Sequence, residues 1–424
     1  MKIDDRQLLY DLFDAYYAAR EHKRNTRSQL DFELRLEENM IRLYDELRAR
    51  RYSPSPCICF VTTEPVTREV FASQFRDRVV HHLLFNYISP ILERTFIYDS
   101  YSCRKEKGTL KALERYEHHI RSCSDNYTRD CYILQLDLKG YFMSINKQIL
   151  YGLLCDSLGR MRHRKAENGK RWDDVVDFEF VDYLIREILM RNPTDHVTKV
   201  GRKRDWANVP PSKSLFCQPE GVGLPIGDLT SQLFSNVYLN PLDQFCKRDL
   251  ACRHYGRYVD DFYIIDNSKT RLKTLVPVIK DMLKSKLGVT LHPHKVHITH
   301  CWKGTQFMGG YVLPYRRMLR ARTIWKFHRA MEDLFLRFSS PDEMSRAEIA
   351  ACLASINSYC GLLGHYDSYN LRKRTLFRPE IYRYLNFMPK FSKCVIKKDK
   401  EIKKWKEIDI EILRKRFADV IDRL

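Results

Sequence analysis

Apolar residues recur at helical spacing in the first 50 positions of the chain. Positions three or four residues apart lie on one face of an α-helix, so each such series predicts a helix with a buried stripe. The two series are Leu9, Leu12, Phe13 and Tyr16, then Leu36, Met40, Leu43 and Leu47. A Ser-Pro repeat at residues 53–56 interrupts the pattern. We therefore predict a helical N-terminal extension over residues 1–55.

Beyond this boundary the pattern alternates between strands and helices. Residues 57–71 have the composition of strands, and residues 79–92 return to helical spacing. Two further apolar runs, 132–138 and 262–265, are rich in residues that favour strands. Helices are also predicted at residues 228–245, 272–287, 327–335 and 350–363, and a strand is predicted at 289–297.

Residues 160–220 have little periodicity and are rich in charge, with basic runs at 160–165 and 199–204. We interpret this segment as an insertion with a short helix near residues 181–190, and its charge suits RNA or a partner protein. A basic stretch at residues 390–404 is expected to form a C-terminal tail with similar partners.

Two adjacent carboxylates, Asp260 and Asp261, are expected at the tip of a hairpin because strand-forming residues flank them. Adjacent carboxylates repel each other, and a divalent cation with hard oxygen ligands relieves the repulsion. An isolated Asp-Asp pair is more often a solvated turn, so a third carboxylate is needed to favour a metal site. Asp137 supplies it at the end of the strand 132–138. Phosphoryl-transfer enzymes hold two metal ions roughly 4 Å apart with such carboxylates.

The composition agrees with a nucleic-acid partner. The 424 residues include 74 Lys and Arg against 54 Asp and Glu, a net charge of +20, which favours a polyanion. Charge alone does not distinguish an RNA-binding protein from a polymerase, but carboxylates clustered in a basic chain favour the polymerase. No apolar run reaches the ~18 residues that span a bilayer and no signal peptide is evident, so we expect a cytoplasmic protein. The 13 Cys show no Cys-x2-Cys pair, which argues against a zinc site or disulfide framework.

Four motifs follow one another in a specific order. They are residues 137–142, the turn and helix start at 223–232, the segment 258–261 and the segment 307–311. In this order the chain resembles reverse transcriptases of the bacterial group II intron-like branch, over about residues 60–374. The resemblance implies an α+β right-hand polymerase fold that makes DNA on an RNA template from dNTPs and a DNA or RNA primer. The implied divisions are fingers at 56–130, a palm with an antiparallel sheet backed by helices at 131–318, a helical thumb at 319–385 and a basic tail at 386–424.

The resemblance also implies the catalytic residues and the metal. Asp137, Asp260 and Asp261 are the expected catalytic carboxylates, and with Leu138 they are the expected positions for two Mg2+ ions, with Mn2+ as an alternative. Lys295 is expected near the leaving pyrophosphate as a general acid.

Further roles concern the nucleotide and the nucleic acid. Arg68 is expected to grip the triphosphate, and the ring of Phe142 to exclude a ribose 2′-hydroxyl. Nucleotide contacts are also implied for Ile226 and Gln232. Contacts with nucleic acid are implied for Arg76, Arg78, Arg104, Ser231, Gly309 and Tyr311. A structural pairing of Arg78 with Asp77 or Glu93 is the alternative for that residue.

One departure from the intron-type pattern indicates which group of reverse transcriptases the chain resembles most. Pro225-Ile226-Gly227 stands where these enzymes usually carry Pro-Gln-Gly. This is similar to the enzymes of diversity-generating retroelements, which copy with errors opposite template adenines. A Gln can hydrogen bond near the nascent base pair, whereas Ile226 can only make apolar contacts. Loss of that hydrogen bond would relax the enzyme's checking of base-pair geometry. The alternative is that Ile226 simply fills an apolar contact. A diversity-generating enzyme implies a template-repeat RNA and a small, basic, oligomeric accessory protein as partners.

Three other functions stay open. An antiviral-defence reverse transcriptase, which makes DNA from its own structured non-coding RNA, has the same palm. A non-catalytic RNA-binding or maturase-like protein has no use for three clustered carboxylates. An RNA-copying RNA polymerase is disfavoured by Phe142. We recognise no endonuclease, integrase or RNase H motif, and therefore expect polymerisation without cleavage.

Overall fold

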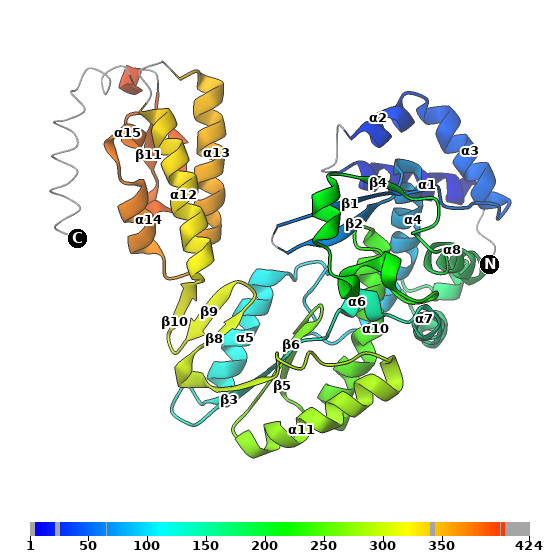
Figure 1. Ribbon diagram of the computed structural model, residues 1–424. Coiled ribbons are helices and arrows are strands. Elements are labelled where there is room, and N and C mark those ends of the chain that lie inside the picture. The colour runs from blue at the N-terminus through cyan, green and yellow to red at the C-terminus, as the bar shows by residue number, and fades with distance from the viewer. Residues whose placement is uncertain (1–4, 22–25, 65, 340–343, 399, 403–424) are drawn as a thin grey trace. The chain divides into compact units, whose positions relative to one another are not determined.

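The computed structural model describes residues 5–21, 26–64, 66–339, 344–398 and 400–402. The chain forms two compact units, whose elements are drawn in Figure 1. The first unit comprises Met1–Arg115 and Cys131–Ile298, and the second comprises Tyr116–Asp130 and Thr299–Leu424. No helix in the described ranges is long and apolar enough to cross a lipid bilayer.

The N-terminal helices of the first unit confirm the helical spacing found in residues 1–50. They are α1 (Asp5–Arg20), α2 (Arg27–Glu33) and α3 (Leu36–Arg48), and they share one core with α4 (Phe75–Leu92). Leu12 and Met40 are completely buried. Tyr87 of α4 donates a hydrogen bond to Asp11 of α1 at 2.6 Å. Because one core includes all four helices, the boundary expected at residue 55 does not separate an extension from the rest.

A three-stranded sheet with the order β2-β1-β4 follows the N-terminal helices. β1 (Ile58–Thr62) and β2 (Arg68–Ala72) are antiparallel, which confirms the strands predicted at residues 57–71. β4 (Thr198–Val200) pairs parallel to β1 and comes from the segment interpreted as an insertion. That segment therefore completes a sheet of the first unit. The helices in and beside it are α7 (Lys147–Arg162), α8 (Phe178–Leu189) and α9 (Lys203–Ala207), of which α8 confirms the predicted short helix.

The central sheet has four strands in the order β5-β6-β3-β7, and β6 is antiparallel to both of its neighbours. These strands are β3 (Tyr132–Leu136), β5 (His254–Tyr258), β6 (Asp261–Asp266) and β7 (His297–His300). The long helices of this region are α10 (Leu229–Gln244) and α11 (Lys269–Met282). α10 packs against α4 and α7, while α11 packs against β3 and β6. Antiparallel strands packed with helices confirm the α+β class.

The strand predicted at residues 289–297 is wrong over most of its length. Leu291 makes only an isolated bridge. A turn follows, in which the N–H of Lys295 donates to the carbonyl of His292 at 3.2 Å. Pro293 within this turn has no N–H to donate to a neighbouring strand, so regular pairing begins only with β7.

The second unit combines a small sheet with helices. The sheet has the order β10-β9-β8 and consists of β8 (Thr305–Phe307), β9 (Gly310–Leu313) and β10 (Arg316–Leu319). α5 (Thr109–Cys123) contributes its C-terminal half, where the ring of Tyr116 stacks on that of Phe307 at 4.7 Å between centroids. The remaining helices are α12 (Ala321–Phe338), α13 (Arg346–Leu363), α14 (Tyr369–Leu376) and α15 (Pro379–Tyr382). α12 and α13 confirm the two helices predicted from apolar spacing.

The start of the basic C-terminal stretch is folded into this second unit. An antiparallel hairpin forms from β11 (Leu385–Phe387) and β12 (Cys394–Ile396). Asn357 of α13 donates to the carbonyl of Cys394 at 3.0 Å and accepts from its N–H at 2.7 Å. The expected tail at 386–424 therefore begins as packed structure, because its first residues include buried apolar side chains. Residues 403–424 of that tail lie outside the described ranges.

Candidate active site

The three predicted carboxylates lie at one end of the central sheet. β3 pairs antiparallel with β6, so Asp137, which follows the last residue of β3, lies beside Asp261, the first residue of β6. Val259 and Asp260 form the two-residue turn between β5 and β6. The sheet thus brings together two motifs that are more than a hundred residues apart in the sequence.

The hairpin turn has a strained backbone at Val259. Its φ is +54°, in the left-handed region that β-branched residues rarely adopt. Two hydrogen bonds hold this conformation: the N–H of Val259 donates to Ser102 Oγ at 3.2 Å, and its carbonyl accepts from Arg257 Nη1 at 3.0 Å. Such strain persists only where the surroundings enforce it. Ser102 and Arg257 therefore set the backbone from which Asp260 projects.

Arg257 is fully buried and pairs with Asp243 of α10. Its Nε and Nη2 each donate to one oxygen of Asp243 at 2.7 Å, which is the bidentate arrangement that guanidinium and carboxylate favour. Asp243 also accepts from the hydroxyl of Tyr255 at 2.6 Å. A buried charge is costly unless it is paired and hydrogen bonded, and this network meets both conditions. Sequence reasoning missed the pair, because nothing in the local pattern connects a helix residue with the strand residue beside the motif.

Partial burial and mutual repulsion raise the pKa of both hairpin carboxyls. For Asp260 the main cause is burial, and the negative charge of Asp137 adds to it. Asp261 is exposed as a residue, but desolvation of its carboxyl group and the charges of Asp260 and Asp137 raise its pKa in the same direction. Lys295 offsets part of the repulsion, since its Nζ lies 2.6 Å from Asp137 Oδ2. Lys295, which was expected near the leaving pyrophosphate, thus lies against a carboxylate of the acidic site.

The chemistry of these donors suits a divalent metal ion. Hard carboxylate oxygens that crowd one another are the ligands used by phosphoryl-transfer sites. Within the described residues, no three Asp, Glu, His or Cys side chains are grouped so that they could hold a metal ion, and Nζ of Lys295 donates a hydrogen bond to Asp137 Oδ2. Leu138, the further predicted metal position, has a buried side chain and forms a bridge with Leu291.

Arg68 lies where its charge acts on the acidic site. It is the first residue of β2 and its side chain is exposed. Its positive charge counteracts part of the rise in the pKa of Asp260. Since no hydrogen bond or ion pair engages its guanidinium within the described residues, the group is available for phosphate oxygens.

Phe142 and Ile226 pack against the same small apolar cluster. Phe142 belongs to the short helix α6 (Tyr141–Ser144), which directly follows the first acidic motif. Ile226 is half-buried, and its carbonyl accepts from the N–H of Phe71 in β2 at 2.8 Å. The buried members of the cluster are Cys57, Cys59, Phe71, Met143 and Leu215. Two residues that were predicted to bind the nucleotide thus pack against the same apolar cluster.

Gly227 is required because the turn approaches β2 very closely. Its φ is +140°, and a Cβ at this position would lie 2.1 Å from the carbonyl oxygen of Phe71. A larger residue would have to displace backbone. The turn that carries Ile226 is therefore held directly on the strand that begins with Arg68.

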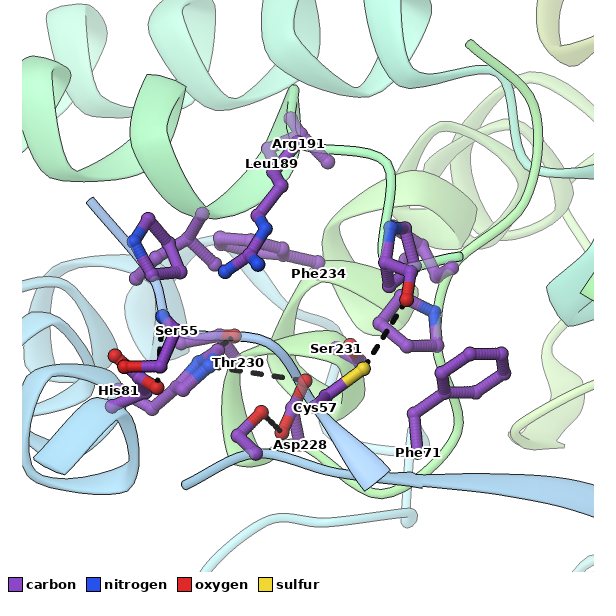
Figure 2. Close-up of a pocket in the computed structure, with 17 residues that line it drawn as sticks. Ser55, Cys57, Phe71, His81, Leu189, Arg191, Asp228, Thr230, Ser231 and Phe234 are labelled. Carbon is purple, nitrogen blue, oxygen red and sulfur yellow. Dashed lines mark hydrogen bonds and ion pairs between the residues drawn. The ribbon is translucent and has the colours of Figure 1, made fainter. Parts of the chain in front are cut away.

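The start of α10 lines a small cavity of about 50 Å³. Figure 2 shows Asp228, Thr230 and Ser231 among the residues around it. Ser73 donates to Asp228 Oδ1 at 2.6 Å, and Nδ1 of His81 is hydrogen bonded to Thr230 Oγ1 at 2.7 Å. Ser231 lines the same cavity and is only 4% exposed. Its expected contact with nucleic acid is not available from this position, because the helix turns Ser231 into the protein.

Gln232, the next residue of α10, is exposed. It lines an open cavity of about 340 Å³ together with Arg78 of α4. The structure therefore brings one predicted nucleotide residue and one predicted nucleic-acid residue to the same space. Arg78 also donates from Nε to the carbonyl of Ser73 at 3.1 Å, and Glu93, one of its expected alternative partners, pairs with another arginine.

That arginine is Arg104, whose role in the structure is internal. Arg104 pairs with Glu93 at 2.8 Å and donates to the carbonyls of Ile97 and Ser100, which leaves 8% of its side chain exposed. Arg76 is likewise engaged, in an ion pair with Glu46. Both arginines therefore stabilise the first unit, and their position does not support the expected contact with nucleic acid.

The predicted turn at residues 307–311 lies in the second unit. Met308 and Gly309 both have positive φ, +44° and +84°, and form a tight turn between β8 and β9. The hydroxyl of Tyr311 donates to the carbonyl of Lys303 at 2.7 Å. The hairpin is thus present at the expected residues.

Residues 194–325 match the family described as reverse transcriptase (RNA-dependent DNA polymerase). This segment contains the hairpin with Asp260 and Asp261 and the turn with Ile226. This part of the chain therefore matches a reverse transcriptase domain, as the order of motifs predicted, and the match supports RNA-directed DNA polymerase activity.

Whole-chain similarities are more distant. The chain is 23% identical over 348 residues to Protein YkfC of Escherichia coli (strain K12), covering 74% of this chain and 78% of YkfC. A C-terminally truncated apo telomerase from Candida tropicalis superposes with a TM-score of 0.44 and 11% identity, covering 63% of this chain and 56% of the telomerase. A telomerase from Candida albicans, in complex with a TWJ fragment of telomeric RNA, gives a TM-score of 0.46 and 9% identity, covering 91% of this chain and 69% of that chain.

Proposed function

We propose that this reverse transcriptase synthesises DNA on an RNA template with Asp137, Asp260 and Asp261 as its catalytic carboxylates. The observation that carries the proposal is their convergence: the end of β3 and the β5–β6 turn place all three at one end of the central sheet. Asp137, Asp260 and Asp261 would hold two Mg2+ ions (or Mn2+), which would supply a lowered pKa for the primer 3′-hydroxyl and positive charge to neutralise the departing pyrophosphate.

The surrounding side chains have distinct tasks in this reaction. Arg68, exposed beside the acidic site, holds the triphosphate through paired N–H donors. Lys295 keeps Asp137 in place and supplies a proton to the leaving group. Phe142, fixed by the apolar cluster, excludes a ribose 2′-hydroxyl because its ring offers no partner for a polar group.

The decisive experiment is primer extension on a defined RNA with dNTPs and Mg2+, followed by sequencing of the product. The full chain should extend the primer, whereas a double variant with Asp260→Asn and Asp261→Asn should not. RNA binding by the variant, measured separately, should persist, because neither carboxylate attracts a polyanion. Extension by the double variant at the wild-type rate would refute the assignment of the carboxylates.

We further propose that the enzyme belongs to the group II intron-like branch and makes errors opposite adenine, as a diversity-generating enzyme does. Support comes from Ile226, whose apolar side chain packs against the same cluster as Phe142 and stands where the related pattern has Gln. The substitution Ile226→Gln should lower misincorporation opposite adenine. Ile226→Val, which keeps the site apolar, is the matched control and should leave the error spectrum unchanged. A template-repeat RNA and a basic, oligomeric accessory protein are the partners that this role implies.

Product sequencing also separates the alternatives. Errors concentrated opposite adenine support the diversity-generating role. Faithful DNA, or a repetitive product that is unrelated to the added template, supports an antiviral-defence enzyme with its own non-coding RNA. RNA binding without synthesis under any condition supports a maturase-like protein.

A further inference from the structure

A third cavity of the first unit, which none of the three carboxylates lines, is lined by arginines. It is open and has a volume of about 540 Å³. Four elements form it: the 3-10 turn η1 (Glu93–Thr95), α7 with the residues that follow it, the end of α10, and η5 (Phe245–Asp249). Its polar lining includes Arg94, Arg160, Arg164, Arg248, Asn240 and Gln244, and no acidic side chain of the described residues lines it. We call it the arginine pocket.

Two of these arginines have side chains that bind no other described residue. The guanidinium groups of Arg164 and Arg248 are exposed, and neither makes a hydrogen bond or ion pair within the described residues. Arginines near helix C-termini often serve backbone carbonyls. Arg94 and Arg160 do so, since they donate to the carbonyls of Lys165 and Asp156 at 2.6 and 3.2 Å. The guanidinium groups of Arg164 and Arg248 make no such bond to a carbonyl among the described residues.

Oriented and unengaged guanidinium groups around one cavity favour a phosphate ligand. Each guanidinium carries five N–H donors, so the single bonds of Arg94 and Arg160 orient these groups and leave further donors. The planar fork of arginine matches phosphate oxygens bidentately. With no carboxylate in the lining, the positive charge of the cavity has no internal counter-charge there.

The surroundings favour an extended polyanion over a small one. Arg160 and Arg164 belong to the basic run at residues 160–165, which continues to Lys165 at the exposed surface. α10 runs from the open cavity lined by Gln232, near its start, to the arginine pocket lined by Gln244, at its end. Twelve helical residues span about 18 Å, a distance that a few nucleotides of RNA bridge.

We propose that the arginine pocket binds phosphate groups of an RNA strand outside the template–primer duplex. This inference goes beyond the proposed polymerase reaction and does not rest on it, because RNA binding is measured without DNA synthesis. It gives a function to the basic segment 160–165, which the catalytic site does not use.

The test compares the full chain with the double variant Arg164→Gln and Arg248→Gln. Fluorescence anisotropy with a labelled, unstructured RNA and no primer measures the affinity over a range of salt concentrations. Loss of two phosphate contacts should lower the salt slope by about 1.4 and weaken binding about 25-fold at 0.1 M salt. Each single variant should weaken binding about 5-fold on the same basis.

The matched control is Lys280→Gln with Lys284→Gln, which changes the net charge equally at exposed positions of the first unit outside the pocket. An equal loss of affinity in this control would show a general charge effect and overturn the proposal. Unchanged RNA affinity in the pocket variants, with loss of pyrophosphate binding, would make the pocket a small-anion site and also overturn it. Thermal melting confirms folding, and extension of a short template–primer duplex should be unchanged.

Discussion

The buried pair of Arg257 and Asp243 leads to a prediction about both stability and catalysis. The substitution Asp243→Asn keeps the shape of the side chain but removes its charge. Asp243 accepts three hydrogen bonds, two from Arg257 and one from Tyr255, at 2.6–2.7 Å. An amide supplies one oxygen, and its NH2 group must face a donor. The guanidinium of Arg257, which is fully buried, would then lack its counter-charge.

Breaking a buried pair on one side costs about 3–5 kcal/mol, since the remaining charge stays desolvated. Domains commonly have only about 5–15 kcal/mol of stability, so this loss is a large fraction of the total. With a urea dependence of about 3 kcal/mol per M, the unfolding midpoint should fall by about 1 to 2 M. Equilibrium urea denaturation followed by circular dichroism measures this shift.

A second variant separates the packing role of the pair from its role at the turn. Arg257→Met combined with Asp243→Leu replaces the charges with apolar groups of similar size, and stability should recover at least in part. Primer extension should not recover, because Val259 then lacks the donor to its carbonyl and Asp260 loses its fixed backbone. Two results would refute this reasoning: a loss below about 1 kcal/mol in Asp243→Asn, or wild-type extension by the apolar pair.

Three further predictions concern the polymerase site. Gly227→Ala should lower both the melting temperature and the extension rate, since its Cβ would meet the carbonyl of Phe71 at 2.1 Å; unchanged values for both would contradict the close approach. Phe142→Ala should raise incorporation of ribonucleotides relative to deoxynucleotides in a competition assay, whereas an unchanged ratio would leave the ring a purely structural role. Lys295→Met should lower the rate of single-turnover extension by about 10²-fold or more if it acts as a general acid, and a rate within a fewfold of wild type would limit Lys295 to holding Asp137.

Local patterns determined much of the candidate site. Asp137 and the Asp260–Asp261 pair were found because each follows or precedes a run of strand-forming residues, and a strand end presents its next side chain at the edge of a sheet. The helices at residues 1–50 and α8 were found for a similar reason, since burial of one face imposes a spacing that can be read along the chain. Such features depend on neighbours in sequence.

Where a prediction failed, a competing local or distant contact had decided the structure. Pro293 and the turn around it interrupt the strand expected at 289–297. The hairpin of β11 and β12 was hidden in a basic stretch, because its few apolar residues become informative only when a helix such as α13 packs on them. Ser231 was expected to contact nucleic acid, but the packing of α10 buries it.

By itself, the sequence determined which residue types are available for chemistry: three carboxylates at strand ends, a basic chain, and an ordered set of polymerase motifs. Only the tertiary structure decided which side chains pair with one another and which share a cavity. It selected Asp243 as the partner of Arg257, Glu93 as the partner of Arg104, and a cavity for the arginines after α7. The physical reason is that charge pairing and packing depend on distances between elements, and residues far apart in the chain acquire those distances only when the elements fold together.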